Sequence, residues 1–355
     1  MPPEPAEPTP PTSVEASATQ QPAAQEPAAQ GAAEPVRAPR RRLFPARGGR
    51  PRSDVEAALH DVETALHDLE TRAREMDARV EARVGRNLPK AILFGLILGF
   101  ALLFSLIVVK EIFMLFGAAL VAFTAYELAS ALRFAGRDVP RIPLVIAAVG
   151  VIAPAFYLGA EGLWWAILGG VAFVSLWRLA EQLIPARRTA AASLGTDLGA
   201  GILVLAYVAL LGGFAVVMAG QPGGQWWVLA YLIVVISIDT GAYASGLLFG
   251  KHPMAPRISP KKTWEGFAGS VVVAIIASVL LGLFMIGIEW WIGALLGLAL
   301  VAAATLGDLT ESLIKRDLGI KDISTWLPGH GGFLDRLDSI LPATVVAYVF
   351  FVVVS

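Results

Sequence analysis

Long apolar stretches separated by short polar loops dominate the chain from residue 91 onward. About 20 residues of helix are needed to cross the hydrocarbon core of a bilayer, and most of these stretches approach that length. The sequence therefore predicts an all-α, polytopic membrane protein with about nine transmembrane helices. The nine stretches lie at about 91–109, 112–132, 142–159, 163–177, 196–219, 226–248, 267–287, 290–306 and 339–354.

The amino-acid composition agrees with this fold class and excludes several kinds of site. The 355 residues are 56% hydrophobic and 16% charged, whereas a soluble domain carries about 25% charged residues. The chain has no cysteine, which excludes disulfides, thiol catalysis and Cys-ligated metals. Its histidines are too few and too scattered to predict a zinc site. They are His60, His67, His252 and His330.

Two segments precede the apolar stretches, and a membrane-embedded domain is predicted over 89–355. Residues 1–52 are rich in Ala, Pro, Glu and Gln, which predicts a disordered tail. The basic patch at its end, 37–52, either attracts anionic lipid headgroups or is a solvated linker that helps to set the topology.

Residues 53–88 carry apolar residues at alternating spacings of four and three. This spacing predicts an amphipathic heptad helix, and we expect it to associate as a coiled coil that makes the protein a homodimer. A single helix lying on the membrane surface is the alternative. Acidic residues are interspersed along the helix, so we expect no nucleic-acid partner.

Charge alternates from loop to loop along the membrane-embedded domain. Basic loops occur at 133–141, 178–195, 249–266 and 307–338, whereas the intervening loops are short and carry little charge. Loops rich in Lys and Arg stay on the cytoplasmic side of a membrane. We therefore expect a multi-pass protein of the cell (inner/plasma) membrane, with the N-terminus and the basic loops in the cytoplasm and the C-terminus outside.

Lysine is used selectively in this chain. Of the 28 Lys and Arg residues, seven are Lys, and five of these lie in the last two basic loops. An ammonium group is a compact point charge that suits phosphate oxygens. We expect phosphate contacts in these loops, although topology alone also explains a cationic loop. The five are Lys251, Lys261, Lys262, Lys315 and Lys321.

Two aspartates lie at the cytoplasmic ends of neighbouring apolar stretches. Asp308 ends one stretch, and Asp335 follows the Pro328–Gly332 turn just before the last stretch. Alone, Asp308 would only cap a helix. Two such carboxylates can hold one Mg²⁺ that also binds substrate phosphates, because this ion takes few protein ligands and keeps several waters. We therefore expect Asp308 and Asp335 to be metal ligands, and a second cation is left open.

Other residues near these loops are expected to support the same chemistry. Gly331 and Gly332 allow close backbone approach to a phosphate, and His330 either donates to a phosphate oxygen or orients a neighbour. Acids within a span are costly, so Asp239 should face a polar cavity shared with the basic loop. Glu127 either has a functional role or pairs with an Arg near a helix end.

The stretch from Ser312 to Asp338 resembles the signature of the phosphatidate cytidylyltransferase (CDP-diacylglycerol synthase) family. Two segments upstream, Ser259–Gly266 and Gly307–Ser312, also look like that family, and the resemblance covers about residues 91–355. The matching signature positions are Ser312, Lys315, Arg316, Lys321, Asp322, Ser324, Leu327, Pro328, His330, Gly331, Gly332, Asp335, Arg336 and Asp338.

The resemblance implies a nine-span enzyme of the lipid bilayer that uses CTP, phosphatidic acid and Mg²⁺. The family's metal-binding aspartates carry over to Asp308 and Asp335. We expect a catalytic set consisting of Lys315, Arg316, Lys321, Asp322, His330, Arg336 and Asp338. We expect a substrate-binding set consisting of Ser259, Lys261, Lys262, Ser312, Gly331, Gly332 and Asp239.

Two alternative functions remain open at this point. Another CTP-using membrane lipid enzyme, such as a polyprenol kinase or an ether-lipid cytidylyltransferase, would need similar phosphate-handling loops. A transporter would place its acids along a permeation path. Against a transporter, the polar residues cluster in two cytoplasmic loops rather than at mid-membrane, where transporter sites usually lie.

Overall fold

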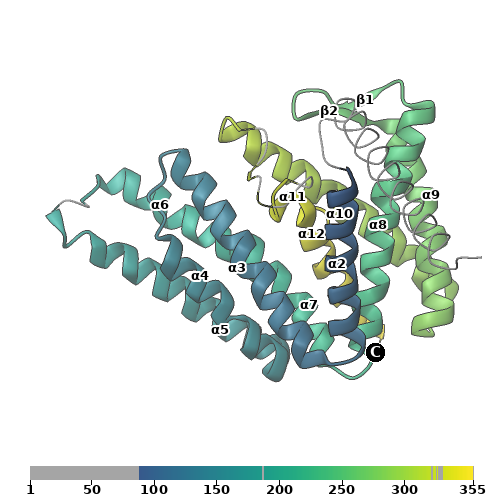
Figure 1. Cartoon of the computed structure of the whole chain (residues 1–355), viewed down its shortest axis with the longest axis horizontal. Coiled ribbons are helices and arrows are strands. Elements are labelled where there is room, and N and C mark those ends of the chain that lie inside the picture. The colour runs from purple at the N-terminus through teal and green to yellow at the C-terminus, as the bar shows by residue number, and fades with distance from the viewer. Residues whose placement is uncertain (1–87, 186–187, 321–322, 325, 327–330, 355) are drawn as a thin grey trace, which may run out of the picture. The chain divides into compact units, whose positions relative to one another are not determined.

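The structure is a computed structural model, and it describes residues 88–354 with gaps at 186–187, 321–322, 325 and 327–330. The predicted tail at 1–52 and almost all of the heptad helix at 53–88 lie outside the described residues, so both stay predictions. The described part is a bundle of helices with one small hairpin (Figure 1).

The helices follow one another with short connections. In chain order they are α2 (Leu88–Ile107), α3 (Lys110–Phe134), α4 (Arg141–Gly150), α5 (Ile152–Glu181), α6 (Ala191–Val204), the π-helix η2 (Leu205–Leu210), α7 (Leu211–Gly220), α8 (Gly224–Phe249), α9 (Trp264–Leu281), the π-helix η3 (Gly282–Ile286), α10 (Trp290–Asp317), α11 (Leu334–Leu337) and α12 (Ile340–Val354). Between α8 and α9, the antiparallel strands β1 (Pro253–Ala255) and β2 (Ser259–Thr263) form the hairpin.

Helix lengths confirm the polytopic helical class. Within the described residues, seven helices are long and apolar enough to cross a membrane, and Gly95–Ile107 and Arg141–Gly150 are shorter apolar helices. α5 kinks at Gly159 (φ 68°, ψ −147°), which is where the third predicted stretch ends. A positive φ of this kind is readily adopted only by glycine. The count of nine crossings is not confirmed by helix length and stays a prediction.

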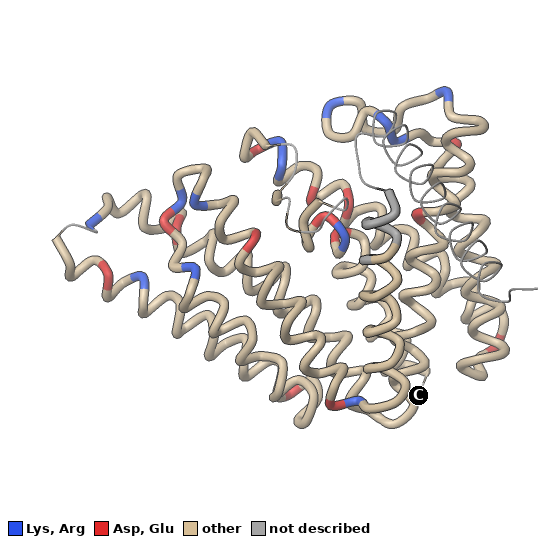
Figure 2. Tube along the Cα trace, viewed as in Figure 1, with Lys and Arg blue, Asp and Glu red and all other residues tan. Residues whose placement is uncertain are grey.

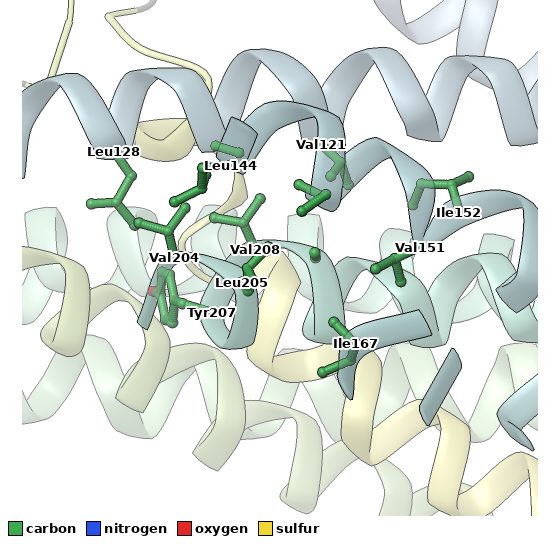
Figure 3. Packing of buried hydrophobic residues seen from close by; sticks show 14 of the residues in the cluster. Val121, Leu128, Leu144, Val151, Ile152, Ile167, Val204, Leu205, Tyr207 and Val208 are labelled. Atoms are coloured by element: carbon green, nitrogen blue, oxygen red, sulfur yellow. The ribbon is translucent and has the colours of Figure 1, made fainter. Parts of the chain in front are cut away.

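Buried apolar side chains form two clusters. The first joins α3 to α7 and includes Leu144 and Val208 (Figure 3). The second joins α8, α9, α10 and α12 and includes Val235. α12 belongs to both, through Leu341 in the first cluster and Ala347 in the second. Because lipid tails are as apolar as these side chains, the clusters stabilise the bundle by close packing rather than by excluding water.

A buried group of charges ties the first set of helices together at one end. Arg178 of α5, whose side chain is 1% exposed, lies 2.8 Å from Asp197 of α6 (Nη2 to Oδ2). The same nitrogen lies 3.2 Å from Asp138 Oδ2 in the connection between α3 and α4. Removing one partner of a buried ion pair leaves an uncompensated charge, so these contacts hold three consecutive elements in place.

Charged residues are unevenly distributed along the helices. Figure 2 shows most Lys and Arg toward the end of the bundle that carries the hairpin and α11, with few at the opposite end. α8, α9 and α10 pack against one another. The last two basic loops of the sequence are thereby brought to the same end of one helix group.

Candidate active site

A cavity of about 550 Å³ lies between α8, the hairpin, α9, α10 and α11. Seven residues of the predicted site line it, although they come from four separate segments of the chain. Their charges are mixed, with four acids beside three bases. The seven are Asp239, Lys261, Lys262, Asp308, Asp335, Arg336 and Asp338.

One face of α10 supplies the centre of this site. The last two turns of the helix carry polar side chains at spacings of three and four, which places them on one side of an α-helix. Ser312 Oγ donates to Asp308 Oδ1 at 3.3 Å. The face consists of Asp308, Glu311, Ser312 and Lys315.

Gly307 explains how α10 comes so close to the start of the last span. A Cβ at this position would collide with the carbonyl oxygen of Asp338 and with the ring of Pro342. Only a glycine permits that approach. As a result Asp308, the next residue, lies within electrostatic range of the Asp338 carboxylate.

The hairpin brings the first basic loop onto α10. Lys262 Nζ lies 2.5 Å from Asp308 Oδ2, and Arg316 Nε donates to the carbonyl oxygen of Ile258 at 3.4 Å. At its far end, the Thr263 side chain accepts a hydrogen bond from the Gly266 amide and caps α9. The basic loop between α8 and α9 is therefore a hairpin with contacts to α10 and to the start of α9.

Asp335 is held by a lysine and by the backbone. Its Oδ1 lies 3.3 Å from Lys315 Nζ, and its Oδ2 accepts a hydrogen bond from the Gly332 amide at 2.9 Å. Lys315 Nζ also lies 2.5 Å from Oε2 of Glu311, a side chain that is fully buried. Gly331 has φ +82°, a conformation that L side chains rarely adopt. The carboxylate of Asp335 is thus presented in one fixed orientation.

The acids of the cavity suit a hard divalent cation. Asp308 lies in electrostatic range of both Asp239 and Asp338, while Asp335 faces Lys315. Across the part of the chain that the structure describes, no three His, Asp or Glu side chains are arranged as a complete metal site. A set of two carboxylates open to one cavity nevertheless fits Mg²⁺, because this ion completes its shell with water and substrate phosphates. The assignment of Asp308 and Asp335 stays a prediction.

The remaining predicted residues lie around the cavity or outside the described residues. Ser259 begins β2, and the position of Asp239 on the cavity wall agrees with the expectation that it shares a cavity with the basic loop. Three residues of the predicted catalytic set lie outside the described part: Lys321, Asp322 and His330.

Two buried glutamates near the site, Glu127 and Glu311, make contacts that the sequence did not predict. Glu127 of α3 does not fit the simple option of an arginine pair, because it accepts hydrogen bonds from the amides of Phe333 and Leu334. Glu311 was not predicted as a site residue. Its spacing of four from Lys315 on one helix is a signal that points to an ion pair.

Comparisons with known proteins agree with the geometry of the site. The model of the cytidylyltransferase family matches residues 89–354. A phosphatidate cytidylyltransferase of Mycobacterium bovis is 42% identical over 277 residues, which cover 77% of this chain and 90% of the relative. Its Mycobacterium tuberculosis counterpart is also 42% identical, with 84% of that relative covered. A phosphatidate cytidylyltransferase of Mycobacterium leprae is 39% identical over 274 residues, covering 75% of this chain and 88% of the relative.

Proposed function

The chain belongs to the cytidylyltransferase family, and from that premise we propose that it is a phosphatidate cytidylyltransferase. It transfers the cytidylyl group of CTP to phosphatidic acid and forms CDP-diacylglycerol for phospholipid biosynthesis. The observation that carries the proposal is the single cavity that joins basic side chains from two loops with carboxylates at the ends of membrane-length helices.

The reaction requires one bond to form and one to break. An oxygen of the lipid phosphate attacks the α-phosphorus of CTP, and the bond from this phosphorus to the bridging oxygen of the β-phosphate breaks. Pyrophosphate leaves with that electron pair. The second pKa of a phosphate monoester is about 6, so the attacking group is already ionised near neutral pH. No general base is therefore needed.

Positive side chains overcome the repulsion between the two anionic substrates. Lys261, Lys262 and Arg336 line the cavity and hold phosphate oxygens of CTP and of the lipid. Lys315 and Arg316, on the adjoining turn of α10, add charge beside Asp335 and the hairpin. Fixed cations stabilise the charge of a transferring phosphoryl group without reorganising during the reaction.

Asp308 and Asp335 are the residues that we propose hold Mg²⁺. When bound, the ion neutralises the triphosphate and stabilises the leaving pyrophosphate. The proposal is supported by the carboxylate and lysine groups that line one cavity. Asp239 and Asp338, which line the same cavity, leave further carboxylates for a second cation.

Apolar and aromatic side chains of the same cavity suit a lipid, and they belong to the set that encloses it. Tyr243, Leu247 and Phe267 line it, and Tyr243 and Leu247 are 73% and 72% exposed on the surface of α8. In a bilayer these side chains face hydrocarbon, so an acyl chain reaches the cavity from the side while its phosphate meets the lysines.

We also propose the setting of the enzyme in the cell. It is a multi-pass protein of the cell (inner/plasma) membrane, its cavity opens toward the cytoplasm, where CTP is made, and it is a homodimer joined by its heptad helix. The alternation of basic and weakly charged loops supports the orientation, and the apolar seam at 53–88 supports the dimer.

Purified protein, labelled CTP, phosphatidic acid and Mg²⁺ provide the test. We expect labelled CDP-diacylglycerol and one pyrophosphate per lipid product. A parallel reaction with a polyprenol in place of phosphatidic acid distinguishes this activity from that of a polyprenol kinase. Transfer of only the γ-phosphate to the polyprenol, or transfer to an ether lipid and not to phosphatidic acid, would reject the proposal.

A further inference from the structure

Glu127 is a buried carboxylate that holds the segment leading into α11. It lies within α3, and its side chain is 2% exposed. Oε1 accepts a hydrogen bond from the Phe333 amide at 3.0 Å, and Oε2 accepts one from the Leu334 amide at 2.9 Å. Ser324 Oγ donates to Oε1 as well. These three donors come from the segment between α10 and α12, far from α3 in the sequence.

Gly332 lies between this carboxylate and Asp335. A Cβ on residue 332 would lie 2.9 Å from Glu127 Oε1 and 3.0 Å from Oε2, which is too close for an ordinary side chain. The amide of the same glycine donates to Asp335 Oδ2 at 2.9 Å. Gly332 therefore has its Cα against Glu127 and its N–H on Asp335, so the two carboxylates are linked through a single residue.

Aromatic side chains of α3 hold the same segment from the side. Phe123 stacks on Phe333 with ring centroids 5.0 Å apart and planes 10° apart. Tyr126 stacks on Trp326 at 5.4 Å. Phe123 lies four residues before Glu127, which places the two side chains on one face of the helix, and Tyr126 is adjacent to Glu127. α3 thus contacts the segment between α10 and α12 at two places, Trp326 and Phe333.

Glu127 does not belong to the cavity itself. It is not among the described residues that line the cavity, and the part of α3 around it packs in the first apolar cluster. Its influence on the reaction has to pass through the backbone that it holds.

We propose that Glu127 is a positioning residue for Asp335. Its carboxylate fixes the amides of Phe333 and Leu334, this places Gly332, and the Gly332 amide in turn orients Asp335 toward the cavity. The turnover part of this inference rests on the proposed function. The role goes beyond the substrate-contacting set, because it assigns part of the site to α3, which contributes none of the described residues that line the cavity.

Glu127→Gln is the first variant to test. The amide keeps the size of the side chain but replaces one acceptor oxygen with an NH2 group. One of the two backbone N–H donors then meets another donor instead of an acceptor. We expect kcat to fall about 10- to 100-fold, as is typical when a group that orients a functional side chain is lost. KM for CTP should change little, because the cavity lysines are untouched. Glu127→Asp, which keeps the charge, should recover part of kcat.

Hydrogen exchange supplies a readout that does not depend on activity. In wild-type and Glu127→Gln protein in detergent, exchange at Phe333 and Leu334 is followed in peptides covering 331–337. We expect it to be about tenfold faster in the variant, because these amides lose a partner and open locally. Exchange in α8 and α9 should be unchanged.

Glu181→Gln is the matched control. Glu181 is also a nearly buried glutamate of a membrane-length helix, and it pairs with Arg178 at 3.6 Å (Oε2 to Nη1). It should lower thermal stability while leaving exchange at 331–337 and kcat per folded molecule unchanged. If Glu127→Gln behaves like this control, Glu127 is only structural and the proposal is rejected.

The remaining outcomes also decide. If Glu127→Gln does not fold, Ser324→Ala removes one donor to the same carboxylate and should give a smaller effect of the same kind. Wild-type exchange and wild-type kcat in Ser324→Ala would then reject the proposal. If wild-type protein makes no CDP-diacylglycerol, the proposed function fails, while the exchange comparison still tests whether Glu127 holds this backbone.

Discussion

Lys262 of the hairpin forms an ion pair with Asp308 of α10, with 2.5 Å between Nζ and Oδ2, and the two side chains are 25% and 28% exposed. A pair this open to solvent contributes only about 0–1 kcal/mol to stability. Both groups are therefore free to exchange this contact for substrate phosphate or metal at little cost. Changes at either residue should affect turnover much more than folding.

Asp308→Asn keeps the size of the side chain and removes its charge. If this carboxylate holds Mg²⁺ on CTP, we expect turnover to fall by about 10³-fold or more, as for other electrostatic groups in phosphoryl transfer. Turnover is measured against Mg²⁺ concentration on protein with a wild-type elution profile. Asp317→Asn, at the exposed end of the same helix, should remain fully active. A wild-type Mg²⁺ response in Asp308→Asn would remove this residue from the metal site.

Lys262→Ala should weaken the binding of CTP. A hydrogen bond to a charged group contributes about 1.5–3 kcal/mol, so kcat/KM for CTP should fall roughly 10- to 100-fold. Lys251 is another of the five lysines expected to contact phosphate, but it is exposed and is not among the described residues that line the cavity, so Lys251→Ala should have a smaller effect. Steady-state kinetics on both variants make the comparison, and equal losses would argue against a specific role for Lys262.

Lys315→Ala should destabilise the protein as well as slow it. Lys315 is the ion-pair partner of Glu311, whose side chain is 0% exposed, and an uncompensated buried charge costs about 3–5 kcal/mol. Thermal unfolding in detergent measures the loss. The double variant Lys315→Met with Glu311→Gln should recover stability and stay nearly inactive. Recovery of turnover in that double variant would show that Lys315 serves the fold alone.

Gly332→Ala should damage the site through steric overlap with Glu127. The new Cβ would lie within 3.0 Å of both carboxylate oxygens, so the backbone that orients Asp335 must shift, and kcat should fall roughly tenfold or more. Gly319→Ala is the comparison, since its φ of +68° is strained for alanine but no atom crowds it. That strain costs about 1–2 kcal/mol and should lower the melting temperature without lowering kcat.

The orientation in the membrane is open to a direct test. The alternating basic loops and nine crossings predict that the end of α12 lies outside the cytoplasm. A reporter that is active only in the cytoplasm, fused after Ser355, should stay silent, and one inserted between β1 and β2 should be active. A strong signal from the fusion after Ser355 would mean that the number of crossings is even.

The sequence predicts much of this site because the charged residues of the site lie beside apolar stretches that can be recognised locally. The lysines of the hairpin loop, Asp308 and Asp335 each stand next to a membrane-length apolar stretch, and the ends of packed spans meet at one membrane surface. This is why residues from four segments line one cavity. The fold class follows for the same reason, since apolar length alone predicts a helical bundle.

The structure adds what local patterns do not contain. The sequence does not show that α3 packs beside the segment before α11, so the partners of Glu127 were not predictable. It does not show that Gly307 permits contact with Pro342, or that β1 pairs with β2 across a proline-rich loop. The sequence predicts a break near Gly159, but not that α5 begins at Ile152 and continues past that kink to Glu181.

The membership of α12 in both apolar clusters has a consequence for biosynthesis. Leu341 and Ala347, six residues apart on one helix, complete different clusters, and α12 is made after every other element described. Until α12 is inserted, each helix group lacks one of its packing partners. Asp335 and Asp338 immediately precede this helix, so the cavity acquires its last two carboxylates in the same step. Completion of the bundle and completion of the site therefore lie close together in the order of synthesis.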